Sequence, residues 1–351
     1  MTGMLRGDEV VISDAAKGSQ IYNKGYFGVP QKGGGLTLDL MEATYLVDSG
    51  RLEVRSKRKQ LSAGDLLRLA HKSSRGFEIR YLVYRELRQR GYIVKMGQPP
   101  LDFRVFPRGG APNKTSSKWW VAAISERSAF DLGDLLDNID RADQIRKKLL
   151  LAVVDEESDV TYYEVRRQSP KGRLGPVNLE TGAEGVVMAD RVMVTDPDAA
   201  ESLRRNHCFG KLIGRILQLS LIEAVFLAEM GALKLRDGRS HRTVGLETLR
   251  RRARKLQPDF DLRSTTFKDL KAKGLIVKTG FKYGSHFRAY EGDPDKNHAK
   301  YLVHAVPEHY KAMWPEVSRA VRLAHGVKKN ILLGRVSPDE VEYVSLMRHR
   351  P

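Results

Sequence analysis

The 351-residue sequence contains the same unit twice. DEVVISD at Asp8–Asp14 returns as DRVMVTD at Asp190–Asp196, and LTLDLMEATYLVDSG from Leu36 returns as LQLSLIEAVFLAEMG from Leu217. RELRQRGYIVK also returns as KDLKAKGLIVK, and IRKKLLLAVV returns as VKKNILLGRV. The spacing between paired words stays between 181 and 183 residues. Solenoid repeats are only about 20–50 residues long, so the chain is predicted to be a tandem duplication of a whole domain.

Each copy mixes helices with strands. A short strand precedes an amphipathic helix that ends at Gly50 or Gly231, and a basic helix, several strands, another helix and a closing hairpin follow. This order predicts a mixed α/β fold, in which each copy has a small α+β N-terminal subdomain followed by an α/β subdomain with a central mixed sheet. The predicted subdomains span 1–90 and 91–167 in the first copy, and 186–273 and 274–351 in the second. Residues 168–185, rich in Gly and Pro, are predicted to form a linker.

The charge balance favours a polyanionic partner. There are 61 Lys and Arg residues against 43 Asp and Glu residues, a formal charge of +18, and nucleic acid is the commonest partner of so basic a chain. The basic residues are spread along the chain and no apolar run approaches about 18 residues, so no membrane association is expected. Cys208 is the only cysteine, which excludes an intramolecular disulfide and a cysteine-based zinc site. With no apolar secretory signal at the N-terminus, a cytoplasmic protein is expected.

Three aligned positions could carry chemistry, and the two copies differ at two of them. The second copy has Tyr290 over Phe106, His298 over Ser116 and Lys329 over Lys147. A phenol, an imidazole and an ammonium group can cleave RNA without a metal: a base takes the 2′-hydroxyl proton, an acid protonates the departing 5′-oxygen, and a cation stabilises the charged phosphorane. No cofactor is therefore expected.

Each of these residues also has an ordinary structural interpretation. A tyrosine at the end of a strand is usually packed, a histidine in a polar loop such as DPDKNHAK is usually solvated, and a lysine after a helix is usually a surface charge. The functional interpretation is favoured because Tyr290 and His298 both lack a counterpart in the first copy.

Four sequence segments show a family resemblance: GLIVKTGFKYGSHFRAYE, NHAKYLV, RAVRLAHGVKK and AVVDEESDVTYYEV. They resemble the archaeal tRNA-splicing endonucleases of the two-repeat type, which work as homodimers, and the likeness runs from about Val10 to the C-terminus. It implies a nuclease-like fold for the α/β subdomains, with Tyr290 as general base, His298 as general acid and Lys329 as transition-state stabiliser. It also implies precursor tRNA or other bulge–helix–bulge RNA as substrate, and 2′,3′-cyclic phosphate and 5′-hydroxyl ends as products.

The same resemblance implies residues that bind the RNA and the second protomer. Two arginines are expected to hold an unpaired base. One falls on Arg322; the other should lie in the last strand, where Leu346 is directly aligned and Arg348 is our substitute. In the first copy an acidic hairpin loop is expected to dock on the other protomer, although such tips are often simple solvated turns; its acids are Asp155, Glu156, Glu157 and Asp159.

Two alternatives remain open. Pro258-Asp259 followed by Asp269-Leu270-Lys271 satisfies the loose pattern PD…(D/E)xK of metal-dependent DNA endonucleases, whose carboxylates hold Mg²⁺. FKDLKAKG, however, predicts a helix where that motif needs a strand. The second alternative is a non-catalytic RNA-binding subunit, against which the presence of Tyr290, His298 and Lys329 argues.

Overall fold

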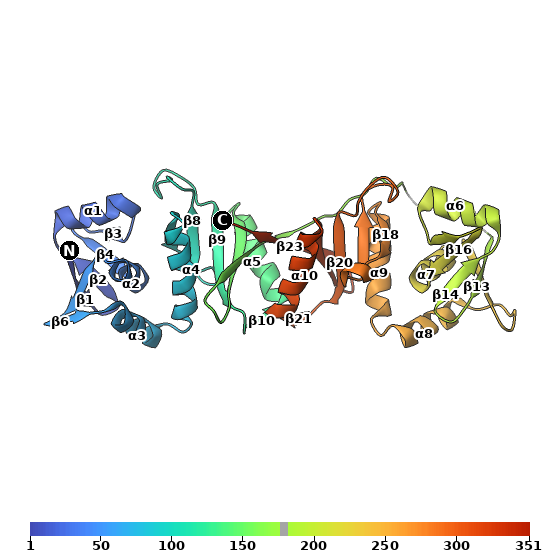
Figure 1. Ribbon diagram of the computed structural model, residues 1–351, viewed down its shortest axis with the longest axis horizontal. Coiled ribbons are helices and arrows are strands. Elements are labelled where there is room, and N and C mark those ends of the chain that lie inside the picture. Colours follow the sequence, from blue (N-terminus) through green and yellow to red (C-terminus); the bar gives the residue numbers. More distant parts are fainter. Residues whose placement is uncertain (176–181) are drawn as a thin grey trace.

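The computed structural model describes residues 1–175 and 182–351, which form four subdomains arranged in a row (Figure 1). The N-terminal subdomain of each copy lies at an outer end, and the two α/β subdomains meet in the middle (Figure 1). This arrangement confirms the predicted mixed α/β class and the duplicated subdomain pair.

The two N-terminal subdomains have the same plan. In the first copy they comprise β1 (Thr2–Arg6), β2 (Glu9–Ile12), α1 (Ala15–Gly25), β3 (Val29–Pro30), β4 (Leu36–Asp39), α2 (Leu40–Asp48), β5 (Glu53–Ser56), β6 (Lys59–Leu61) and α3 (Ala63–Ser73). In the second they comprise β13 (Ala183–Val187), β14 (Arg191–Val194), α6 (Pro197–His207), β15 (Lys211–Ile213), β16 (Ile216–Ser220), α7 (Leu221–Glu229), β17 (Leu233–Asp237) and α8 (Leu246–Leu256). The sheet orders β3-β4-β2-β1-β5-β6 and β15-β16-β14-β13-β17 correspond strand for strand, apart from β6.

The two α/β subdomains share one ten-stranded sheet, in the order β18-β19-β20-β22-β23-β12-β11-β9-β8-β7. The first contributes α4 (Phe77–Gln89), β7 (Ile93–Met96), β8 (Phe103–Phe106), β9 (Trp119–Ser125), β10 (Ala129–Asp131), α5 (Leu132–Gln144), β11 (Lys148–Val154) and β12 (Val160–Arg167). The second contributes α9 (Phe260–Ala272), β18 (Ile276–Thr279), the short 3₁₀ helix η1 (Phe281–Tyr283), β19 (Phe287–Tyr290), β20 (Tyr301–Pro307), β21 (Lys311–Met313), α10 (Trp314–Gly326), β22 (Asn330–Val336) and β23 (Val341–His349). Parallel pairs β9–β11 and β20–β22 make the sheet mixed, as predicted.

The copies join through their last strands. β12 pairs with β23 antiparallel, with Val165 opposite Leu346, and β10 pairs with β21 beside them. Helices α4 and α9 pack on one face of the sheet, and α5 and α10 pack on the other. Because the buried residues on the α5 and α10 face form one continuous cluster across the junction, the two copies share a core.

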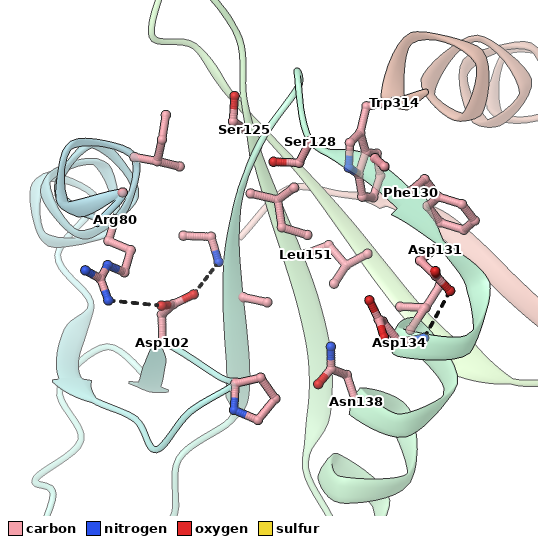
Figure 2. Close-up of a pocket in the computed structure, with 18 of the residues that line it drawn as sticks. Arg80, Asp102, Ser125, Ser128, Phe130, Asp131, Asp134, Asn138, Leu151 and Trp314 are labelled. Carbon is pink, nitrogen blue, oxygen red and sulfur yellow. Dashed lines mark hydrogen bonds and ion pairs between the residues drawn. The ribbon is translucent and has the colours of Figure 1, made fainter. Parts of the chain in front are cut away.

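Each copy has a cavity beside the helix that it contributes to this shared core, α5 in the first copy and α10 in the second. In the first copy the cavity measures about 600 Å³ and lies between β9 and α5, and Asp102, Asp131 and Asp134 are among the residues that line it (Figure 2). In the second copy the equivalent cavity measures about 340 Å³ and lies between η1, β22 and α10.

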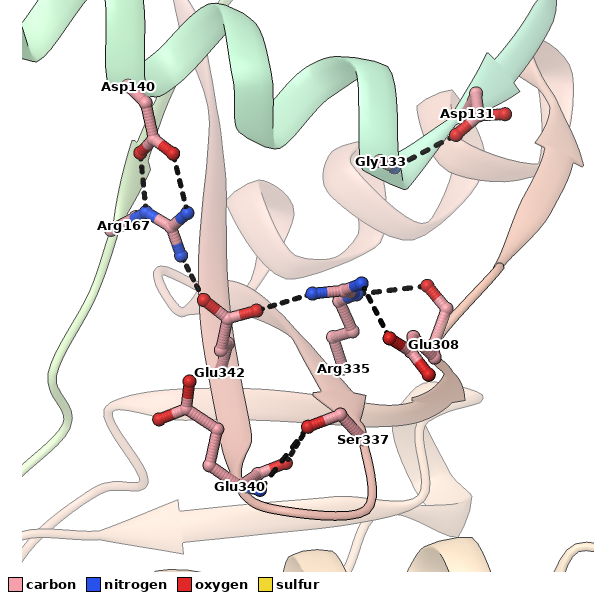
Figure 3. Close-up of polar contacts among 9 residues, drawn as sticks. All are labelled: Asp131, Gly133, Asp140, Arg167, Glu308, Arg335, Ser337, Glu340 and Glu342. Atoms are coloured by element: carbon pink, nitrogen blue, oxygen red, sulfur yellow. Dashed lines mark hydrogen bonds and ion pairs between the residues drawn. The ribbon is translucent and has the colours of Figure 1, made fainter.

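A chain of ion pairs also crosses the junction (Figure 3). Arg167 of the first copy donates two hydrogen bonds to Asp140, at 2.8 and 2.9 Å, and pairs with Glu342 of the second copy. Glu342 in turn accepts from Arg335 at 2.6 Å, and Arg335 donates to the Glu308 carbonyl at 2.9 Å. These groups fix the relative position of the two halves more than they stabilise the fold, because partly exposed ion pairs contribute little net free energy.

A repeated polar contact holds each N-terminal subdomain on its α/β subdomain. Glu42 accepts from the Gly28 amide at 2.8 Å and from Lys95 Nζ at 3.0 Å. Gly28 has φ 72°, and a Cβ there would lie 2.5 Å from the Thr37 carbonyl oxygen, so the position requires glycine. In the second copy Glu223, Gly210 and Lys278 form the equivalent contact.

Asp39, which precedes α2, makes the first copy sensitive to pH. Burial raises the pKa of this carboxyl to about 7 from the ordinary 3.8, and the neighbouring Glu42 adds to the rise. The folded state therefore holds the proton more tightly than the unfolded state. The free energy of unfolding that depends on Asp39 falls as the pH rises from about 4 to about 7, and stays low above that window.

Asp39→Ser should remove this dependence. Ser220 occupies the equivalent N-cap position in the second copy, so serine keeps the cap. The free energy of unfolding of the variant minus that of the wild type should increase as the pH rises through this window. Urea unfolding at several pH values measures this difference. Asp14→Ser is the control: the pKa of Asp14, an exposed N-cap, is lowered by hydrogen bonds from Lys17, so its variant should show no such gain. A pH-independent difference for Asp39→Ser would contradict the argument.

Strand β13 begins at Ala183, inside the range 168–185 that was predicted to be a linker. Residues 176–181 of that range lie outside the described residues. In the part of the chain that is described, no helix combines the length and apolar character that crossing a membrane requires.

Candidate active site

The register of three neighbouring strands brings the ends of β19, β20 and β22 together. Ala289 lies opposite Tyr301, and Tyr301 lies opposite Asn330. Tyr290 is the last residue of β19, His298 lies three residues before β20, and Lys329 directly precedes β22. The structure therefore places the three sequence-predicted residues at the same end of three adjacent strands.

The ring of Tyr290 is packed in a small hydrophobic cluster. The residue is 7% exposed and clusters with Ile276, Ala299 and Cys208, and Leu174 packs against this cluster from the segment after the first copy. The Arg288 guanidinium carbon lies 5.9 Å from the ring centre. This packing fixes the ring position and leaves positive charge beside it.

Lys329 is positioned by the turn between α10 and β22. The preceding residue, Lys328, has φ 54°, and Arg146 has the same φ at the equivalent turn before Lys147. Lys329 Nζ donates to a carbonyl of its own turn at 3.3 Å and lies 5.5 Å from the ring centre of Tyr283. The same backbone geometry therefore presents a lysine in both copies.

His298 lies on an exposed turn. Asp293 organises this turn by accepting from the Asn297 amide at 2.9 Å through its carbonyl and from the Asp295 amide at 3.0 Å through its carboxylate. Within the described ranges, the imidazole contacts neither Tyr290 nor Lys329. The side chain of His298 is therefore exposed to solvent.

Three charged residues at the site were not predicted from the sequence. Arg288 lies 5.9 Å from the ring centres of both Tyr283 and Tyr290, and its Nε donates to the Thr279 carbonyl at 2.8 Å. Strand alternation could have found it, because residues two apart share a face.

The other two residues form an ion pair. Lys300 donates to Glu291 at 2.6 Å, and this hydrogen bond raises the pKa of the lysine. The amide of Lys300 bonds to Ala289 and its carbonyl to the Asn330 amide, both at 3.0 Å, so Lys300 sits between the three strand ends. This placement depends on the sheet register and had no local sequence signal.

The two predicted base-holding arginines lie near the junction of the copies. Arg322, exposed on α10, lines a cavity of about 570 Å³ that Thr161 and Tyr163 of the first copy also line. Arg348 is exposed and lies opposite Tyr163 in the β12–β23 register. Leu346 is 1% exposed and belongs to the core, so it is not available to hold a base.

Two of the four acidic side chains of the first copy's loop already have partners within the chain. Asp155 accepts from the amides of Glu157 and Asp159, at 3.0 and 2.9 Å, and thereby shapes the turn. Glu156 pairs with Arg127. The carboxylates of Glu157 and Asp159 are exposed and have no side-chain partner among the residues that the structure describes.

The residues of the DNA-endonuclease pattern have structural roles. Asp259 pairs with Arg263 at 2.7 Å and with His286 at 3.5 Å. Asp269 lies within α9, as predicted, and accepts from the Tyr343 hydroxyl at 2.6 Å. Over 1–175 and 182–351, no three His, Cys, Asp or Glu side chains group as metal ligands. This arrangement lacks the strand that the motif needs.

Comparison with known proteins gives two family matches, each found twice. The family described as "tRNA intron endonuclease, N-terminal domain" matches residues 1–67 and 183–250, and "tRNA intron endonuclease, catalytic C-terminal domain" matches residues 77–162 and 260–343. The chain is 39% identical to a tRNA-splicing endonuclease of Methanococcoides burtonii over 97% of both chains. It is 36% identical to one of Methanosarcina mazei, covering 98% of this chain and 97% of the relative, and 30% identical to one of Halobacterium salinarum over the full length of both.

Proposed function

Because the chain belongs to the tRNA intron endonuclease family, we propose that it excises introns from precursor tRNA by cutting bulge–helix–bulge RNA. The chain is an endonuclease, and the family resemblance inferred from its sequence is confirmed. The proposed reaction is metal-independent attack of the 2′-hydroxyl on the adjacent phosphate. The observation that supports this proposal is the position of Tyr290, His298 and Lys329 at one end of three adjacent strands. The first copy has only the lysine of this set.

The geometry suits three separate roles. Tyr290, fixed by its packed ring, takes the 2′-hydroxyl proton, and the nearby Arg288 supports a phenolate. His298, whose side chain is exposed, protonates the departing 5′-oxygen. Lys329 stabilises the negative charge that develops on the phosphorane. The attack forms the bond between the 2′-oxygen and phosphorus, and breaks the bond between phosphorus and the 5′-oxygen.

The arginines would bind the unpaired part of the substrate. RNA-binding proteins commonly stack unpaired bases on guanidinium planes. Arg322 and Arg348 are proposed for this role because both are exposed and both lie beside the first copy's Tyr163, one through a shared cavity and the other through strand pairing.

The reaction is tested by incubating the purified chain with a bulge–helix–bulge RNA in excess EDTA and analysing the ends. Cleavage should persist and should leave 2′,3′-cyclic phosphate and 5′-hydroxyl ends, since side chains supply the base, the acid and the cation. A requirement for Mg²⁺, or 5′-phosphate ends, would contradict the proposal and favour the metal-dependent alternative.

We also propose that two chains form a homodimer. Releasing an intron needs two cuts, and each chain has the full set of three groups only once. A two-fold dimer, the commonest closed oligomer, presents two sites at a fixed separation. The acidic loop would dock on a basic face of the partner's second copy, which complementary charge would favour.

The docking prediction concerns the two exposed acids of the loop. Glu157→Gln with Asp159→Asn should weaken the dimer and lower the cleavage rate while the melting temperature hardly changes, because neither carboxylate has a partner within the described chain. Asp339→Asn with Glu340→Gln, in the equivalent hairpin of the second copy, is the matched control and should leave association intact. Sedimentation at working concentration measures the association of both double variants. A fully active wild-type monomer, or an unchanged dimer in the loop variant, would rule out docking through this loop.

A further inference from the structure

The cavities beside α5 and α10 occupy equivalent places in the two copies. Ser128, Asn138 and Leu151 line the first, and the residues 182 positions later, Tyr310, Ala320 and Leu333, line the second. Both cavities are bounded by the same sheet face and by the equivalent helix, and the first also reaches residues 75–80 at the start of α4. Their linings can therefore be compared where the two cavities coincide.

The two linings differ in charge. Four carboxylates line the first cavity, those of Glu78, Asp102, Asp131 and Asp134, against two guanidinium groups, those of Arg75 and Arg80. Arg80 pairs with Asp102 (Figure 2). The lining has a net negative charge, which disfavours a phosphate.

The second cavity is mainly apolar, with Tyr283 and Leu323 in its wall. Two cationic residues, Lys282 and Arg319, line it against one carboxylate, Glu316. By its charge and polarity, the second cavity suits a flat, uncharged group attached to a phosphate better than the first does. At about 340 Å³ the second cavity falls in the size range of small-molecule sites.

The second cavity adjoins the active site through one aromatic ring. Tyr283 lines the cavity, and its ring centre lies 5.5 Å from Lys329 Nζ and 5.9 Å from the Arg288 guanidinium carbon. Arg288 is equally close to Tyr290. A nucleotide whose phosphate contacts Lys329 therefore has its base within reach of the cavity.

His304 gives this cavity a polar group that the first copy lacks. Its ring lies 5.4 Å from that of His286, and in the described part of the chain its ring nitrogens make no hydrogen bond. Burial, aided by the charge of Arg263, lowers the pKa of His304 to about 4, so the ring is neutral at pH 7. A neutral imidazole offers one donor and one acceptor, which match the edge of a nucleobase. Ala122 stands at the equivalent position of the first copy.

We propose that this cavity receives an unpaired nucleobase next to the scissile phosphate, with Tyr283 as its stacking surface and His304 as the residue that reads its edge. This inference rests on the proposed cleavage of bulge–helix–bulge RNA and adds a base-specific subsite to it. Tyr283 and His304 are then specificity-determining residues, distinct from the groups that move protons.

The test uses single-turnover cleavage by the full chain. The substrates are an intact bulge–helix–bulge RNA and a series in which one bulge nucleotide at a time lacks its base. For the wild type, one abasic position should lower the rate on the order of 10- to 100-fold, the range that stacking of one base supplies. Ala320→Trp, which fills the cavity from α10, should lower the rate on intact RNA by a similar factor and abolish the abasic penalty at that position.

Asn138→Trp is the matched control, because it fills the first-copy cavity from the same place on α5 and should leave both rates unchanged. If Ala320→Trp does not fold, as its melting curve would reveal, His304→Ala carries the test: it should equalise the rates for the four bases at the sensitive position. The inference is overturned if the wild type cleaves every abasic RNA like intact RNA, or if the variant that is tested retains the wild-type base dependence. Absence of any wild-type cleavage of intact RNA would instead overturn the proposed function, and the inference with it.

Discussion

Replacing His298 by alanine should lower the cleavage rate by about 10²–10⁴, the usual contribution of a positioned general acid. RNA binding should be largely kept, because the imidazole lies on an exposed turn and contacts neither Tyr290 nor Lys329 within the described residues. Single-turnover rates at saturating RNA, with binding measured separately, distinguish the two effects.

The duplication supplies the control for this experiment. Ser116 is exposed at the equivalent position of the first copy, so Ser116→Ala should leave the rate unchanged. Equal losses from the two substitutions would show that the comparison between the copies has assigned the active site to the wrong residues.

Removing only the hydroxyl of Tyr290 should have an effect of the same size. In Tyr290→Phe the ring can keep its packing against Ile276 and Ala299, so the melting temperature should hardly change. The rate should fall by about 10²–10⁴, because the group that accepts the 2′-hydroxyl proton is lost.

The first copy again provides the comparison. Phe106 is buried at the position equivalent to Tyr290, which shows that the fold accepts phenylalanine there. Phe106→Tyr should add no activity, since Ser116 cannot replace an imidazole as an acid. A Tyr290→Phe variant with the wild-type rate would mean that another group is the base.

Much of the local structure follows from local sequence patterns. The helix predicted before the closing hairpin of the second copy is α10, Trp314–Gly326. FKDLKAKG was predicted to be helical, and α9 ends within it. By contrast, the sequence analysis did not place α1, in which only Gly18 and Ile21 are buried, because so short an apolar stripe gives almost no periodic signal.

The contacts between distant segments could not be predicted in the same way. The pairing of β12 with β23 joins residues that are far apart along the chain, from 177 positions for Arg167 and Val344 to 187 for Tyr162 and His349. Nothing in either strand identifies its partner. The candidate site shows the same limit. Comparison of the copies singled out Tyr290, His298 and Lys329, whereas Lys300 and its pairing with Glu291 depend on the register of β19 and β20. The catalytic roles stay predictions until the variants are measured.

The pairing of β12 with β23 also bears on how such a chain can evolve. Two equivalent strands paired antiparallel, with β10 and β21 paired beside them, form the kind of contact that two separate copies make across a two-fold axis. Covalent fusion sets the effective concentration of the two halves by their tether instead of by their supply in the cell. One half can then accumulate changes in its chemistry as long as its edge strand still pairs. On the proposed assignment of the active site, Phe106 and Ser116 belong to a half that is free to serve as scaffold, while selection for catalysis acts on the half that contains Tyr290, His298 and Lys329.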